Sequence, residues 1–384
     1  MGYNHAMTLH AFAACAPGLE SVLAAECAAL GLTPHRESAG AALKGGVGLV
    51  AEIPALARAN RELRTASRIL VRVGMPFHAR TFEELIGRGV RLPWSRFLKP
   101  GAPIAWRVTC RGSRLFHSDA VAERLHLALS QTLGAEPPLA PFDEDRGGDA
   151  QLIVVRLVDD VCTVSVDSSG PHLHRRGYRL ATAKAPLRET LAAAMLLAAG
   201  WDPTQPLIDP FCGSGTIPIE AALLASGRAP NAARTLPLNR WPCAQGLPVG
   251  AAPSVHRPAP TAPLIIASDR DAGAITAARD NAKRAGVAEW IDFRQHSVSD
   301  LKPPLGHGWV ITNPPYGQRV GGPDLRNLYA RFGAVLREQC PEWSACLLAN
   351  DPALIRQTHL ALSPLWHSDN GGLTVGAFAG SIRA

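Results

Sequence analysis

Strand-like and helix-like segments alternate along the second half of the chain, from residue 187 to residue 378. Short apolar stretches such as 264–268 are followed by longer stretches with helical spacing, such as 272–285, which ends before a glycine. This alternation predicts an α/β fold with a doubly wound, mostly parallel sheet. Because ligands of such sheets bind beyond the carboxyl ends of the strands, the residues at those ends are the first candidates for a functional site.

The first of these ends carries a glycine-containing loop. An expected strand at 207–208 runs into Asp209-Pro210-Phe211-Cys212-Gly213-Ser214-Gly215-Thr216, and a helix is expected from 217 to 225. Gly213 and Gly215 allow a sharp turn and a close approach to a ligand. The start of the following helix suits a carboxylate. No Gly-Lys-Ser/Thr follows, and Ile217-Pro218 stands in place of a third glycine, so neither a Walker loop nor a dinucleotide loop is predicted.

The next strand end carries Asp269. A carboxylate at this position can accept hydrogen bonds from both hydroxyls of a ribose. The alternative is that Asp269 caps the helix expected from Ala272. The two roles are compatible, and we favour the ribose.

A third strand end, after the apolar run 309–312, carries Asn313-Pro314-Pro315-Tyr316. The prolines have no N–H for a sheet ladder, so the strand stops there. The Asn313 amide and the Pro314 carbonyl then offer two oxygen acceptors beside the ring of Tyr316. This set fits a planar exocyclic amine on a nucleobase, although a simple polar turn is the alternative. The four residues suit guanine N2 and adenine N6 equally.

Together, the three strand ends describe a nucleoside with an amino-acid tail facing a nucleobase amine. S-adenosylmethionine is such a nucleoside, and its methyl group would move by in-line displacement, with most of the rate coming from positioning. Its sulfonium is already a good leaving group, so we expect no metal. The eight cysteines form no Cys-x-x-Cys pair and no zinc-type spacing with histidines. They indicate reduced thiols and a cytoplasmic protein.

Charge is unevenly placed along the chain. Of the net charge of +7, residues 171–384 hold 21 basic and 15 acidic residues, a net of +6. No acid precedes Glu189 in the junction segment, whose basic residues are Arg175, Arg176, Arg179, Lys184 and Arg188. Such a run is often only a solvated face, but at a domain junction it can hold a phosphate backbone. No apolar run approaches 18 residues, and the N-terminus lacks a signal-peptide pattern, so we expect no membrane span.

The first half of the chain is predicted to hold a small α/β unit over residues 8–73 and a hairpin over 152–166. A helix at 53–63 that ran on would place Arg61, Arg64 and Arg68 on one face. Residues 111–114 form a basic turn with Arg111 and Arg114. Residues 229–263 are proline-rich and predict a long irregular loop.

The order of these motifs resembles bacterial THUMP-containing guanine-N2 RNA methyltransferases, most closely the 23S rRNA enzymes. The resemblance rests on residues 173–179 and 185–189, the glycine loop and residues 313–319. It extends to 63–68 and 113–118 in the first half. It implies four segments: a ferredoxin-like one at 1–70, a THUMP RNA-binding domain at 71–170, a basic linker at 171–190 and a class I methyltransferase domain at 191–384.

The resemblance also implies roles for individual residues. The predicted catalytic residues, which handle the target base, are Asn313, Pro314, Pro315 and Tyr316. The predicted contacts to S-adenosylmethionine are Asp209, Cys212, Gly213, Ser214, Gly215, Thr216, Asp269, Arg270, Ser297 and Asn313. The predicted contacts to RNA are Arg64, Arg68, Arg111, Arg114, Arg175, Arg176, Arg179, Lys184 and Arg188.

Three features depart from the family pattern. Ser297 stands where these enzymes often carry an aspartate near the adenine amine, a place that Asp300 takes if the register slips. The segment 229–263 differs from the family's usual one, and we expect no second methyltransferase module of the kind that is fused in some relatives. The prediction is a monomeric enzyme that methylates guanine N2 in 23S rRNA. The alternatives are a tRNA guanine-N2 enzyme, an adenine-N6 enzyme and a non-catalytic RNA-binding assembly factor.

Overall fold

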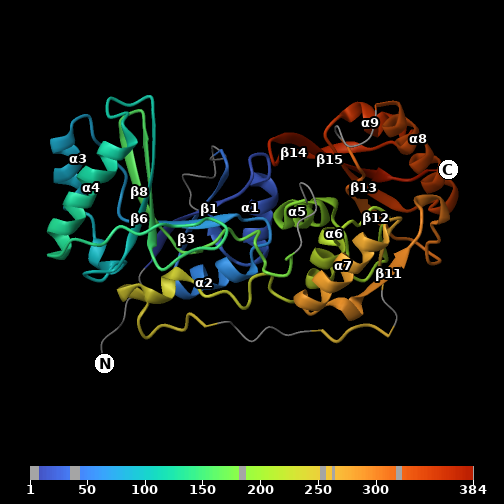
Figure 1. Cartoon of the computed structure of the whole chain (residues 1–384), viewed down its shortest axis with the longest axis horizontal. Coiled ribbons are helices and arrows are strands. Elements are labelled where there is room, and N and C mark those ends of the chain that lie inside the picture. The colour runs from blue at the N-terminus through green and yellow to red at the C-terminus, as the bar shows by residue number, and fades with distance from the viewer. Residues whose placement is uncertain are drawn as a thin grey trace. The chain divides into compact units, whose positions relative to one another are not determined.

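The computed structural model describes residues 8–34, 44–180, 187–250, 257–261, 264–316 and 322–383. In these ranges the chain divides into two compact units, each with its own sheet. The first unit holds the sheet strands that precede residue 168, together with the segment 233–250. The second holds the helices and strands that follow residue 187, apart from that segment (Figure 1).

The strands of the first unit are β1 (Leu9–Ala14), β2 (Thr33–Pro34), β3 (Gly46–Ala51), β4 (Arg68–Arg72), β5 (Phe77–His78), β6 (Ile104–Arg111), β7 (Gln151–Val158) and β8 (Val161–Asp167). The helices in this part of the chain are α1 (Glu20–Ala29), α2 (Ile53–Glu62), α3 (Phe82–Gly89) and α4 (Ser118–Leu133). The sheet order is β2-β3-β1-β4-β8-β7-β6, with β5 beside β8. Its pairings are antiparallel except for that of β6 with β7.

The predicted hairpin is present, and its turn residues Asp159 and Asp160 have φ of 49° and 63°. Such positive values are needed in a two-residue hairpin turn, and aspartate tolerates them. The helix predicted at 53–63 ends at Glu62, because the backbone of Leu63 is extended (φ −63°, ψ 123°). The expectation that Arg61, Arg64 and Arg68 share a helix face is therefore wrong.

The proline-rich segment is only partly irregular. It forms two short 3-10 turns, Pro237–Arg240 and Pro242–Ala244. Between them lies Trp241, which is fully buried and donates its Nε1–H to Gln151 Oε1 at 2.8 Å. Its ring meets that of Phe97 edge-on, with centroids 5.1 Å apart. An indole that is both packed and hydrogen-bonded makes this segment part of the core of the first unit.

The strands of the second unit are β9 (Leu207–Asp209), β10 (Ile265–Asp269), β11 (Ile291–Gln295), β12 (Trp309–Thr312), β13 (Ser344–Ala349), β14 (Ser363–Asn370) and β15 (Leu373–Ser381). Its helices are α5 (Glu189–Ala199), α6 (Thr216–Ala225), α7 (Ala272–Ala285), α8 (Gly322–Gln339) and α9 (Pro352–Gln357). The sheet order is β11-β10-β9-β12-β13-β15-β14, and only β15 runs antiparallel to its neighbours. The predicted doubly wound, mostly parallel sheet is confirmed.

Helices pack in two groups on the second sheet, α5 with α6 and α7, and α8 with α9 (Figure 1). The α8 side chains Tyr329, Phe332 and Leu336 are fully buried in the core beneath them. The strand order reverses between β9 and β12, and these two strands are adjacent and parallel. Their carboxyl ends form the switch point at which such folds bind ligands.

Candidate active site

Asp209 joins the carboxyl ends of β9 and β12. Its carboxylate is 1% exposed, and Oδ1 accepts hydrogen bonds from the Thr312 hydroxyl at 2.5 Å and the Phe211 N–H at 3.2 Å. Burial raises the pKa of the Asp209 carboxyl to about 7. The structure therefore corrects its predicted role as a cofactor contact: the carboxylate faces inward and ties two strand ends together.

The glycine loop after Asp209 has the conformation that its sequence predicts. Gly213 and Gly215 have φ of +52° and +85°. A Cβ on Gly215 would lie 3.0 Å from the Cβ of Ala278 on α7, whereas one on Gly213 would meet nothing within 4 Å. Gly215 thus allows close packing, and Gly213 leaves an open side for a ligand. No side chain caps the start of α6, so its N–H groups can serve a carboxylate.

Asp269 links two binding loops. Its Oδ2 accepts a hydrogen bond from the Gly213 N–H at 3.0 Å, and its Oδ1 accepts one from the Asp271 N–H at 3.0 Å. The cap of α7 is Asp271, whose Oδ1 accepts from the N–H groups of Gly273 and Ala274. The N-cap alternative for Asp269 is therefore wrong. Its carboxylate is half-buried and retains lone pairs for the hydroxyls of a ribose.

The remaining predicted cofactor contacts differ in exposure. Arg270 and Ser297 are exposed, and Gly213 and Ser214 are half-exposed. Ser297 Oγ also accepts a hydrogen bond from the Ser299 N–H at 3.3 Å. The side chains of Cys212 and Thr216 are buried, which leaves only their backbone for a ligand. The Asp269 carboxylate can accept hydrogen bonds from ribose hydroxyls, and the free N–H groups at the start of α6 can donate to a carboxylate. The residues at this edge therefore fit S-adenosylmethionine.

Asn281 holds the glycine loop through a hydrogen bond from α7, a role that the sequence did not predict. It is fully buried on α7 and donates its Nδ2–H to the Ser214 carbonyl at 2.9 Å. Its Oδ1 accepts from the Arg284 guanidinium, which also donates to the Tyr178 carbonyl at 2.7 Å. The one signal in the sequence was an asparagine at a core-facing position of a helix.

The turn Asn313–Tyr316 lies at the end of β12, beside the loop that follows β9. Asn313 Oδ1 is buried and has no hydrogen-bond partner among the described residues. Tyr316 packs against the core under α8, and its hydroxyl accepts from Asn370 Nδ2 at 3.3 Å. Residues 317–319 of the motif lie outside the described residues. A buried acceptor without a partner is costly, so it marks a place where a ligand donor is expected.

Four of the predicted RNA contacts are buried: Arg64, Arg68, Arg176 and Arg179. Arg68 pairs with the fully buried Asp167 at 2.5 Å. Arg176 pairs with Glu220 at 3.5 Å, with both side chains at most 1% exposed, and Arg179 pairs with Glu189 at 2.5 Å. Removing one partner from a buried pair strands the other charge. The structure therefore corrects these predictions: the four arginine side chains are buried and do not present a basic surface.

The other predicted RNA contacts stay candidates. Arg111, Arg114, Arg175 and Arg188 are exposed, and Lys184 lies outside the described residues. Near Arg114, the ring of Phe116 is 67% exposed and lies 4.1 Å from that of His117. This loop between β6 and α4 thus combines positive charge with exposed aromatic rings.

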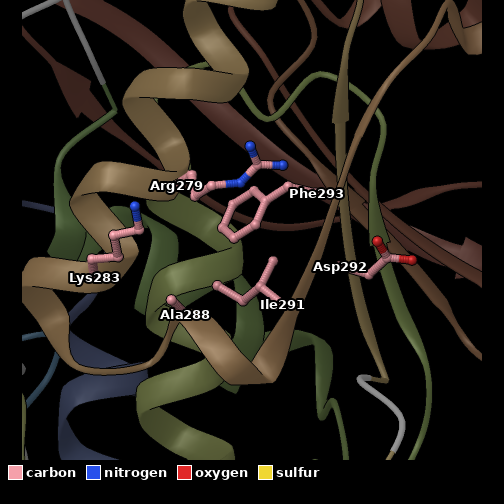
Figure 2. A pocket seen from close by; sticks show the side chains of 6 residues that line it. All are labelled: Arg279, Lys283, Ala288, Ile291, Asp292 and Phe293. Atoms are coloured by element: carbon pink, nitrogen blue, oxygen red, sulfur yellow. The ribbon is translucent and has the colours of Figure 1, made fainter.

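A shallow groove lies between the last turns of α7 and the start of β11 (Figure 2). The Arg279 guanidinium lies over the ring of Phe293, 5.7 Å from its centroid, and Lys283 lines the same groove. Because it lies at the amino end of β11, the groove is separate from the carboxyl edge that carries Asp269 and Asn313.

Comparison with known proteins identifies the family. Residues 176–371 match the RMKL-like methyltransferase domain, and residues 10–70 match the RlmL ferredoxin-like domain. The chain belongs to the RMKL-like methyltransferase family. Its fold is accordingly a ferredoxin-like N-terminal part followed by a class I methyltransferase, and its cofactor is S-adenosylmethionine.

Two curated relatives span most of the chain. The protein is 34% identical to "Ribosomal RNA large subunit methyltransferase K/L" of Syntrophotalea carbinolica over 386 residues. The alignment covers 94% of this chain and 52% of that protein. The chain thus spans about half the length of this relative. It is 33% identical over 350 residues to "Putative RNA methyltransferase YpsC" of Bacillus subtilis, covering 90% of this chain and 89% of that one.

A solved structure of similar fold was determined with SAH bound. SMU.472, described as a putative methyltransferase complexed with SAH, superposes with a TM-score of 0.80 at 28% identity and covers 97% of each chain. In the part of the chain that the structure describes, no helix has the length and apolar character needed to cross a membrane.

Proposed function

We propose that this protein transfers the methyl group of S-adenosylmethionine to the exocyclic N2 of a guanine in 23S rRNA. The observation that carries the proposal is the Oδ1 of Asn313, which is buried, has no hydrogen-bond partner among the residues that the structure describes, and lies at the strand end next to the glycine loop. The similarity to a ribosomal RNA large subunit methyltransferase supports RNA as the substrate. The choice of guanine N2 rests on the family resemblance of the whole motif set.

The chemistry follows from the two sides of the site. When bound, S-adenosylmethionine supplies an electrophilic methyl group on a sulfonium. Asn313 Oδ1 and the Pro314 carbonyl oxygen accept hydrogen bonds from the two N–H groups of the amine, which directs the lone pair of the nitrogen toward the methyl carbon. The nitrogen forms a bond to that carbon, the carbon–sulfur bond breaks with its electrons remaining on sulfur, and the amine then loses one proton to water. The ring of Tyr316 stacks on the base, which must leave its stack in the RNA to reach it.

RNA affinity is assigned to exposed arginines outside this site. Arg111 ends β6, and Arg114 lies in the loop that follows, which also carries the exposed Phe116; this combination suits phosphates and unstacked bases. We expect the double variant Arg111→Ala and Arg114→Ala to bind RNA more weakly and to lower the slope of log affinity against log salt by about 2. Filter binding from low to high salt measures this slope. An unchanged slope, equal to that of Arg88→Ala on the exposed face of α3, would contradict the assignment.

The decisive experiment is a nucleoside digest. Ribosomal RNA and tRNA from a strain lacking the gene are digested separately, and N2-methylguanosine and N6-methyladenosine are measured by mass spectrometry. Loss of N2-methylguanosine from 23S rRNA supports the proposal. Loss from tRNA alone favours the tRNA enzyme, and loss of N6-methyladenosine favours the adenine enzyme. If neither nucleoside changes and calorimetry detects no binding of S-adenosylmethionine, a non-catalytic assembly factor is favoured instead.

A further inference from the structure

Tyr178 lies in the junction motif that follows residue 173 and connects two helices of the second unit. Its side chain is 4% exposed, and its hydroxyl donates a hydrogen bond to Glu220 Oε1 on α6 at 3.3 Å. Its backbone carbonyl accepts a hydrogen bond from the Arg284 guanidinium on α7 at 2.7 Å. A single residue thus holds both α6 and α7, although both helices lie far from it in the sequence.

Buried surroundings strengthen the contact between Tyr178 and Glu220. Glu220 is fully buried, and its Oε1 also accepts a hydrogen bond from the Arg176 guanidinium at 3.5 Å. Burial, and after it the nearby Glu220 carboxylate, raises the pKa of the Tyr178 hydroxyl well above its ordinary value, so the hydroxyl keeps its proton and can donate. Gly177 has a φ of +90°, which a glycine adopts without strain, and the chain turns there between Arg176 and Tyr178.

The neighbouring helices α6 and α7 follow the two loops that form the cofactor site (Figure 1). The glycine loop leads into α6, whose first N–H groups suit the carboxylate of the amino-acid tail. Asp269, which suits the ribose, accepts a hydrogen bond from the N–H of Asp271, the cap of α7. The relative position of the two helices therefore affects the distance between the groups that meet the tail and those that meet the ribose.

The two helices pack closely at one level and are joined through Tyr178 at another. A Cβ on Gly215, at the start of α6, would lie 3.0 Å from the Cβ of Ala278 on α7. Glu220 lies five residues after Gly215. Arg284 lies six residues after Ala278. At about 1.5 Å per residue, these separations are roughly 7.5 and 9 Å along the two helices, so Tyr178 reaches both at nearly the same level.

A second link at that level restricts tilting of α6 about the contact between Gly215 and Ala278. The hydrogen bond from the Gly213 N–H to Asp269 holds the loop beside the ribose site but leaves the direction of α6 to the helix contacts. A tilt of α6 would change the distance from its first N–H groups to Asp269. A ligand that binds at both places loses affinity when they cannot be engaged together, whereas a ligand that binds at one place does not.

We propose that Tyr178 is a positioning residue for S-adenosylmethionine, because it fixes α6 against α7 and so matches the tail site to the ribose site. The inference goes beyond the proposed function, since it holds whichever base is methylated. It gives the junction motif a role toward the cofactor, whereas the sequence predicted a role toward RNA for Arg176 and Arg179, whose side chains are buried.

Two ligands separate positioning from stability alone. S-adenosylhomocysteine carries both the ribose and the amino-acid tail, whereas 5′-methylthioadenosine carries the ribose and lacks the tail. Tyr178→Phe removes only the hydroxyl. In this variant we expect the Kd for S-adenosylhomocysteine to rise about 10-fold and the Kd for 5′-methylthioadenosine to stay within about two-fold of wild type. Calorimetry on the whole chain, without RNA, gives both constants.

A second variant tests the link to α7. Arg284→Met keeps the length of the side chain and removes the donor to the Tyr178 carbonyl, so it should also weaken S-adenosylhomocysteine more than 5′-methylthioadenosine. Its control is Lys283→Met, at the exposed neighbouring position. The control for Tyr178→Phe is Tyr329→Phe, at a fully buried tyrosine whose hydroxyl has no hydrogen-bond partner among the described residues. Both controls should bind each ligand as wild type does.

Unfolding midpoints without ligand complete the test. The midpoint of Tyr178→Phe should fall, because the buried Glu220 carboxylate loses a donor, but a loss of stability alone does not distinguish the two ligands. An equal rise in both Kd values, or a Kd for S-adenosylhomocysteine equal to that of Tyr329→Phe, would overturn the inference and leave Tyr178 with a role in stability only. A nucleoside digest that contradicts guanine N2 as the target would leave this result unaffected.

Discussion

The glycine loop and the Asn-Pro-Pro-Tyr turn end adjacent strands of one sheet but satisfy their polar groups in opposite ways. Around the glycine loop the protein supplies the partners: Thr312 for Asp209, the Gly213 N–H for Asp269, and Asn281 for the Ser214 carbonyl. At the turn, Asn313 Oδ1 has no partner among the described residues, and neither does Asn350 Oδ1 on the next strand.

This difference indicates how the two halves of the site are prepared for their ligands. The cofactor side is held rigid by internal hydrogen bonds before anything binds, which lowers the cost of ordering it. On the side proposed to bind the base, Asn313 Oδ1 is buried and lacks a partner within the described ranges, so the free protein is less stable there than it could be. A substrate amine then gains a full hydrogen bond at an already desolvated acceptor.

The largest expected effect comes from the unpaired side. Asn313→Ala should lower kcat about 1000-fold, or roughly 4 kcal/mol of transition-state stabilisation, because the amine loses its acceptor. The unfolding midpoint should change little, since Asn313 Oδ1 bonds nothing within the described protein. Methyl transfer to rRNA from the deletion strain measures the rate.

Asn313→Asp keeps an acceptor oxygen of the same length and should retain part of this rate. Asn239→Ala, at an exposed asparagine, is the control for the substitution itself. If Asn313→Ala kept a rate within about five-fold of wild type, the acceptor role would be wrong. The contrast between the two loops would then have no catalytic meaning.

The next largest effect is expected at Asp209 beside the glycine loop, where the free energy of unfolding should depend on pH. Asp209 has its carboxyl pKa raised from 3.8 to about 7 by burial. Below pH 4 the folded and unfolded states both hold the proton. Between pH 4 and pH 7 the unfolded chain ionises while the folded chain does not, so wild-type stability falls through this window and is level above it.

Asp209→Asn removes this titration and keeps Oδ1 for the Thr312 hydroxyl and the Phe211 N–H. Its stability relative to wild type should therefore rise between pH 4 and pH 7, by at most roughly 4 kcal/mol. Urea unfolding of both proteins at pH 4.5, 6 and 7.5 measures the gap. Asp300→Asn, an exposed carboxylate at the same sheet edge, is the control. A gap that does not change with pH would show that Asp209 is ionised throughout.

Much of the second unit could be predicted from the sequence because its signals are local. The helix at 272–285 and the strand at 309–312 have the predicted bounds. The strand β14 is not evident from the sequence. It contains Pro364, many of its side chains are exposed, and it forms the edge of the sheet. An edge strand depends on its neighbour for definition, and no short-range pattern reports that neighbour.

The same limit explains the errors at the site. The sequence placed Asp269 and Asn313 at strand ends, and in the structure Asp269 ends β10 and Asn313 follows β12 directly. Whether an arginine is exposed or paired depends on residues far away in the chain: Asp167 for Arg68 and Glu220 for Arg176. A run of basic residues therefore predicts charge but not surface.

The smallest expected effect tests whether the internal support of the glycine loop matters for the cofactor. Asn281→Ala removes the hydrogen bond to the Ser214 carbonyl and leaves that loop less ordered. We expect the Kd for S-adenosylmethionine to rise about 10-fold, equal to about 1.4 kcal/mol. The rate at saturating cofactor should stay within about three-fold of wild type, since the base side is untouched.

Thr276→Ala, an exposed position on the same helix, should leave the Kd unchanged. Calorimetry gives the Kd. A Kd equal to that of wild type would mean that the loop holds its shape without Asn281, and that the two strand ends differ less in preorganisation than their hydrogen bonds indicate.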